Sequence, residues 1–81
     1  MKLDVRLFAR ARDAAGCEQV TVELPADACV ADLRAALASH SPNLRPLVSS
    51  LLVAVGTEYA DDRVILSPQA QVACFPPVSG G

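Results

Sequence analysis

The chain has 81 residues, of which 52% are hydrophobic, 4% aromatic and 20% charged, with a formal net charge of −2. This length allows one small domain, and the composition predicts a folded, aliphatic core rather than disorder. The slight negative charge gives no reason to expect nucleic acid as a partner, and no apolar run reaches the ~20 residues of a membrane span.

The cysteines and the histidine bear on metal binding and on location. Cys17, Cys29 and Cys74 are widely spaced, and His40 is the single histidine. A zinc site of the usual Cys and His kind cannot be assembled from them, so we expect no metal and free thiols that pack as small apolar groups. Free thiols, together with a charged strand pattern directly after Met1 in place of a signal peptide, predict a cytoplasmic location.

The first part of the chain predicts a β-hairpin. Residues 2–7 alternate between polar and apolar, as in a strand with one wet face, and Phe8 and Ala9 extend that strand. Residues 12–16 interrupt the pattern, and a second alternating segment over 19–24 pairs with the first. Four of the seven basic residues lie in the first twelve positions, which indicates either a solvated face or a basic docking edge.

The middle of the chain predicts one main helix over residues 30–40. Val30, Leu33 and Leu37 share one face of that helix. Ser41 and the proline after it end the helix, because proline disfavours the α conformation of the preceding residue. A connection or a short helical turn follows.

The remaining segments predict three strands. Residues 51–55 are continuously apolar, which is typical of a strand buried on both faces. A turn then leads into a short, edge-like strand over 58–60, residues 64–66 are a brief apolar return, and 71–75 form the last strand. These elements predict an α+β domain over residues 1–75, with a helix across one face of a mixed sheet.

Residues 76–81 form a predicted tail. Pro76 and Pro77 restrict φ and favour an extended start, and four further residues span at most ~13–14 Å. Gly80 and Gly81 have no side chain to obstruct passage through a narrow channel, and the carboxylate of Gly81 is open to adenylation by ATP and then to attack by sulfide. A flexible end without function is the alternative.

Taken together, these motifs resemble the MoaD and ThiS family of ubiquitin-like, β-grasp sulfur carriers over essentially the whole chain. The resemblance is carried by residues 7–16, 30–37, 53–59 and 72–81. The ending Pro-Pro-Val-Ser-Gly-Gly looks like the molybdopterin branch of the family rather than the thiamine branch.

The resemblance implies a β-grasp fold and the role of sulfur carrier in molybdopterin synthase. An E1-like (MoeB-like) enzyme would adenylate Gly81 with ATP, and a sulfur donor protein would convert it to a thiocarboxylate. The large (MoaE-like) subunit would then receive the tail, and sulfur would pass to cyclic pyranopterin monophosphate to form the dithiolene of molybdopterin. The chain itself would bind no cofactor. The implied tail contacts are Pro76, Pro77, Val78, Ser79 and Gly80, and the implied docking face is Phe8, Arg12 and Phe75.

Several alternatives remain open. The chain could carry sulfur for thiamine or cysteine synthesis, act as a ubiquitin-like modifier that joins Gly81 to a lysine amine, or be an interaction module with an idle tail. Phe8 and Phe75 could be core residues, and Arg12 a solvated charge. Catalysis by the chain alone is not expected, because the sequence offers no nucleophile and base pair and no metal set.

Overall fold

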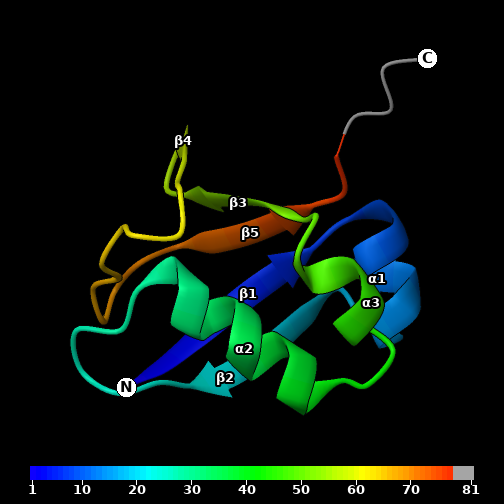
Figure 1. The fold of residues 1–81 in the computed structure, drawn as a ribbon, viewed down its shortest axis with the longest axis horizontal. Coiled ribbons are helices and arrows are strands. Elements are labelled where there is room, and N and C mark those ends of the chain that lie inside the picture. Colours follow the sequence, from blue (N-terminus) through cyan, green and yellow to red (C-terminus); the bar gives the residue numbers. More distant parts are fainter. Residues whose placement is uncertain (78–81) are drawn as a thin grey trace.

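A computed structural model describes residues 1–77 of the chain (Figure 1). The five strands form one sheet in the order β2-β1-β5-β3-β4. Within this described part, no helix is long and apolar enough to cross a membrane. The elements are β1 (Lys2–Leu7), α1 (Ala9–Ala15), β2 (Gln19–Glu23), α2 (Val30–His40), α3 (Arg45–Val48), β3 (Leu52–Val55), β4 (Glu58–Tyr59) and β5 (Val72–Phe75).

The centre of the sheet is β5, the last strand along the described chain. It pairs in parallel with β1 and antiparallel with β3, while β2 and β4 complete the two antiparallel edges. Parallel strands need a long crossover between them, and α2 lies in this crossover, packed across one face of the sheet (Figure 1). This arrangement is an α+β, β-grasp fold, so the predicted fold class is confirmed.

The hydrophobic core lies between the sheet and the helices. Side chains on β1 alternate between exposed and buried, and the buried set points toward α2. Burying one such aliphatic side chain contributes about 1.5–3 kcal/mol, so this layer is the main source of stability. The largest fully buried side chains are Leu3, Val5, Leu7, Val30, Leu33, Leu37, Leu44, Val53 and Cys74.

The predicted helix over residues 30–40 is confirmed, and a cap fixes where it begins. The carboxylate of Asp32 accepts a hydrogen bond from the backbone N–H of Cys29 at 3.0 Å, which satisfies a donor at the start of the helix. Ser41 ends the helix in an extended conformation, directly before Pro42.

The segment after β4 is tied to α2 by a partly buried ion pair. Arg34 of α2, with a side chain only 18% exposed, lies 2.7 Å from Asp62. Its guanidinium also donates to the backbone carbonyl of Val48. These contacts join α2 to the loop that follows β4 and to the end of α3.

One sequence expectation is wrong at the end of the first strand. Phe8 and Ala9 do not extend β1; instead, Phe8 precedes α1 and Ala9 begins it with a φ of 53°. The left-handed conformation of Ala9 turns the chain sharply out of the sheet. Gly16, with a φ of 78°, then ends α1 as a left-handed C-terminal residue. The strands still pair as predicted, but a helix connects them.

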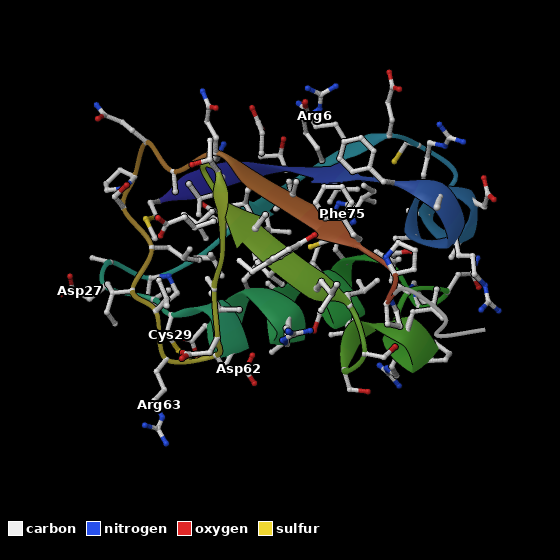
Figure 2. The ribbon with its side chains drawn as sticks, turned by 90° about the horizontal axis from the view of Figure 1, so that it is seen from above. Arg6, Asp27, Cys29, Asp62, Arg63 and Phe75 are labelled. Carbon is white, nitrogen blue, oxygen red and sulfur yellow. The ribbon has the colours of Figure 1, made fainter. Side chains whose placement is uncertain are left out.

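A second expectation, that β3 is buried on both faces, is also wrong. Val53 is buried beneath the helices, whereas Leu52 and Ala54 on the opposite face are only half-buried. The reason is that α2 and α3 cover one face of the sheet, whereas Arg6 lies on the other face, away from these helices (Figure 2). We call this second side the open face.

Candidate docking surface beside the C-terminal segment

The chain's two phenylalanines and single tyrosine meet on the open face. The rings of Phe8 and Phe75 stack with centroids 4.7 Å apart and planes inclined by 7°. Tyr59 meets Phe75 edge-on, with centroids 6.4 Å apart. Both geometries suit the aromatic quadrupole. None of these residues belongs to the buried core, so we refer to Phe8, Tyr59 and Phe75 as the aromatic cluster.

Strand β5 places Phe75 in this cluster. Val72 and Cys74 point into the core, so Ala73 and Phe75 necessarily point to the open face. The backbone N–H of Phe8 donates to the carbonyl of Cys74 at 3.2 Å, which keeps Phe8 beside the end of β5. The turn at Ala9 then leads the chain away, so the Phe8 ring remains on the open face against Phe75.

Tyr59 reaches the cluster from the far edge of the sheet and was missed by the sequence reasoning. Its Cα is paired with that of Ala54 in β3, and Ala54 is paired with Ala73 in β5. Residues paired across strands share a face, so Tyr59 lies on the same side as Phe75. Its side chain is 68% exposed. An exposed aromatic ring in a two-residue edge strand was the available signal.

The structure brings together two of the three predicted docking residues. Phe8 and Phe75 are in contact, whereas Arg12 lies on α1 with its side chain 53% exposed and 3.9 Å from Asp13. The guanidinium beside the cluster belongs instead to Arg6, which lies 5.8 Å from the centroid of the Phe8 ring. Arg6 is one of the four basic residues in the first twelve positions, for which the sequence left both a docking edge and a solvated face open.

The predicted tail begins where the cluster ends. Pro76 and Pro77 follow Phe75 directly, and Pro77 is exposed. The other predicted tail residues, Val78, Ser79, Gly80 and Gly81, lie outside the described residues. The aromatic cluster is therefore continuous along the chain with the start of the tail.

The three thiols are free and differ in reactivity. Burial raises the pKa of Cys74 from its ordinary value of 9.0 to about 11, and the nearby Arg34 charge only partly opposes this rise. Thiols react as thiolates, so Cys74 is chemically quiet at neutral pH, whereas Cys17 is exposed.

The β-grasp fold places the chain in the class of ubiquitin-like domains. Within that class, the sequence profile described as the ThiS family matches residues 5–81. The chain belongs to the ThiS family.

Similar proteins agree with this assignment. The molybdopterin synthase sulfur carrier subunit of Arabidopsis thaliana is 31% identical over all of this chain and 84% of its own length. The subunit of the same name from Chlamydomonas reinhardtii is 34% identical, with full coverage of both chains. The crystal structure of SAMP1 from Haloferax volcanii superposes with a TM-score of 0.89 at 30% identity, also with full coverage of both chains. The predicted family and its molybdopterin branch are thereby confirmed.

Proposed function

We propose that this chain is the sulfur carrier subunit of a molybdopterin synthase, and that the Gly81 carboxylate is its reaction centre. The observation that carries the proposal is the aromatic cluster, a partly exposed aromatic surface placed immediately before Pro76 and Pro77. A carrier needs a surface that partners can hold and a chain end that they can reach. Family membership and the two named relatives support the same function.

A carboxylate does not react with nucleophiles until it is activated, so the cycle begins with adenylation of Gly81. An oxygen of the Gly81 carboxylate attacks the α-phosphorus of ATP on an E1-like enzyme, and pyrophosphate leaves. Hydrosulfide supplied by a sulfur donor protein then attacks the carbonyl carbon, and AMP leaves with the electron pair of the C–O bond. The product is a thiocarboxylate, whose sulfur is a soft nucleophile toward cyclic pyranopterin monophosphate. ATP is used by the activating enzyme, and the chain needs no cofactor of its own.

The partner of the final step is the large synthase subunit. Both relatives are named as subunits, and a carrier without acid and base groups of its own depends on a second protein for substrate binding and proton transfer. In this proposal Pro76 to Gly80 thread the tail into that subunit while Phe8 and Phe75 dock against its surface. Three free thiols suit a reducing compartment, and we place the cycle in the cytoplasm.

Intact-mass analysis tests the proposal. The full chain is incubated with ATP, the E1-like enzyme and a sulfur donor, and it should gain the mass difference between one sulfur and one oxygen atom. A variant with one residue added after Gly81 should gain nothing, and its unfolding curve should match that of the parent chain. A parent chain that shows no mass gain, or an extended variant that still supports molybdopterin formation, would refute the proposal.

A second candidate is a ubiquitin-like protein modifier. The structure with a TM-score of 0.89 is SAMP1, and a second crystal structure names that protein as small archaeal modifier protein 1. The two functions share the adenylate and differ in the acceptor, sulfide for a carrier and a lysine amine for a modifier. Mass spectrometry of trypsin-digested cell proteins separates them, because a modifier leaves residues 64–81, the tryptic segment after Arg63, on lysine, whereas a carrier leaves none.

A further inference from the structure

Three charged side chains of β1 point to the open face, and strand β2 places a residue of opposite charge or a hydrogen-bond donor opposite two of them. Lys2 is paired across the strands with Glu23, which carries the opposite charge. Asp4 is paired with Thr21, whose hydroxyl donates to its carboxylate at 2.6 Å.

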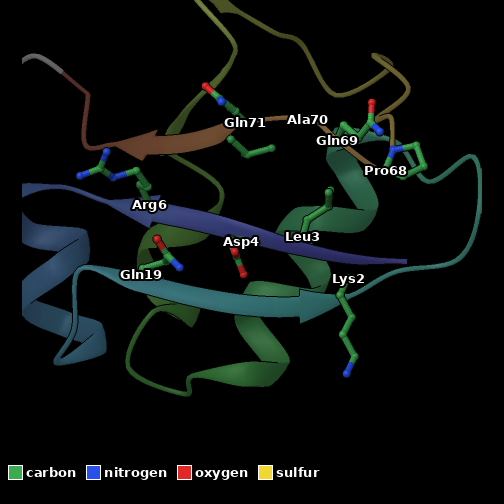
Figure 3. Close-up of a pocket in the computed structure, with 10 residues that line it drawn as sticks. Lys2, Leu3, Asp4, Arg6, Gln19, Pro68, Gln69, Ala70 and Gln71 are labelled. Carbon is green, nitrogen blue, oxygen red and sulfur yellow. The ribbon is translucent and has the colours of Figure 1, made fainter.

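Arg6 is the exception in this row of charges. Its partner in β2 is the neutral Gln19, and its partner in β5 is Ala73. Among residues 1–77, no carboxylate lies within ion-pairing distance of Arg6. Figure 3 shows its side chain leaving β1 on the side of β5, away from Asp4, at the rim of a shallow polar hollow.

The register also defines what lies between Arg6 and the far edge of the sheet. Arg6 is paired with Ala73, Ala73 with Ala54, and Ala54 with Tyr59. One row across the open face therefore runs from a guanidinium over two alanines to an aromatic ring. We call this row, in which two short alanine side chains lie between Arg6 and Tyr59, the trough. The stacked rings of Phe8 and Phe75 lie beside the trough, toward the end of β5.

The guanidinium of Arg6 restricts which partner surface can cover the trough. The guanidinium of Arg6 makes a cation–π contact with Phe8, at 5.8 Å from the ring centroid. This contact leaves the five N–H donors of Arg6 free for other acceptors. A partner that covers the trough removes water from those donors, which is costly unless an acceptor replaces it. Arginine matches a carboxylate with two parallel hydrogen bonds. A partner with a carboxylate at this point is favoured, and one without it is penalised.

We infer that Arg6 is a specificity-determining residue of the docking surface and pairs with a carboxylate of the large synthase subunit. The same partner places an apolar side chain over Ala54 and Ala73, between Arg6 and Tyr59. This inference rests on the proposed function, which supplies the partner, and adds the chemistry by which that partner is recognised. The occupant follows from charge complementarity, since Arg6 is the one outward charge of β1 without a complement on β2.

Binding of the purified large subunit to Arg6 variants tests the inference. Arg6→Glu places like charges together and should weaken binding about 30-fold or more, while Arg6→Met keeps the apolar stem and should weaken it about 10-fold. The Met variant should also show a flatter dependence of affinity on salt. Arg63→Glu is the matched control, because Arg63 is exposed and lies far from Arg6 (Figure 2); its affinity should stay within about threefold.

Further measurements separate the possible failures. The free energy of unfolding of Arg6→Glu should equal that of the parent chain, so a binding loss cannot come from misfolding. Reversing the partner carboxylate to lysine should restore binding of Arg6→Glu. If the parent chain binds and Arg6→Glu binds equally well, this inference is wrong and the proposed function stands. If the parent chain does not bind the large subunit, this inference and the proposed function are both wrong. If Arg6 instead controls association between copies of this chain, the assignment of the partner is wrong.

Discussion

The two faces of the sheet are built from the same strands and are used in opposite ways. On β5, Val72 and Cys74 point under the helices, while Ala73 and Phe75 point to the open face. The covered face carries aliphatic side chains, and the open face carries small, aromatic and charged ones. Because alternate residues of a strand point to opposite faces, one set of β5 side chains stabilises the core and the other set is available for binding a partner. Substitutions should therefore divide into those that unfold the protein and those that only uncouple it from partners.

The largest effect on stability is expected on the covered face. Leu33 of α2 is 0% exposed, and Leu33→Ala removes its packing and leaves a cavity. The free energy of unfolding should fall by about 3 kcal/mol, measured by urea denaturation. Partner affinity at a temperature where the variant is folded should be unchanged. A variant that keeps full stability would contradict the placement of the core.

An intermediate effect is expected from the buried thiol of Cys74 at alkaline pH. Its pKa in the folded protein is about 11, against 9.0 for an ordinary thiol. Between pH 9 and 11 the Cys74 thiol therefore stays protonated in the folded state and loses its proton in the unfolded state. Its contribution to the free energy of unfolding is fully present below pH 9 and is lost between pH 9 and 11. The loss should amount to roughly 2–3 kcal/mol. Denaturation curves across this range measure it, and Cys74→Ala should abolish this part of the pH dependence.

The smallest effect on stability is expected on the open face, where the effect on binding is large. Tyr59→Ser removes a residue that is 68% exposed together with its edge-on contact with Phe75, so the free energy of unfolding should fall by about 1 kcal/mol or less. Affinity for the large subunit should fall by about tenfold or more, because exposed aromatic residues are common binding hot spots. Ile65→Ser is a suitable control, since Ile65 is 59% exposed and lies outside the aromatic cluster. Equal affinity losses in both variants would argue against a local contact.

Much of this division could be predicted from the sequence, because alternation reports which face a residue occupies. The 30–40 helix and the pairing of the first two strands follow from periodicity and from Ser41-Pro42. The alternation in the last strand puts Val72 and Phe75 on different faces, but it left a core position for Phe75 open. The contact between Phe8 and Phe75 could be suggested only by resemblance. It joins residues far apart in the chain, and the parallel pairing of β1 with β5 brings them together.

Other parts could not be predicted, because they depend on tertiary pairing. α1 was missed because apolar alternation was extended through Phe8, and the left-handed turn at Ala9 goes against the preference of alanine. Its alanine and arginine content was the overlooked signal for a helix. The trough between Arg6 and Tyr59 requires the register of four strands, and each residue alone reads as an ordinary surface position.

The central position of β5 in the sheet determines when the newly synthesised chain can fold. Ribosomes release this strand after every other strand of the described chain, yet β1 and β3 both pair with it. Pairing between strands so distant in sequence is slow and cannot begin until the later one is available. A nascent or truncated chain that lacks β5 also lacks Ala73 and Phe75, so it can present neither the trough nor the stacked rings. Partner enzymes that hold this face would therefore select finished molecules, without a separate quality-control step.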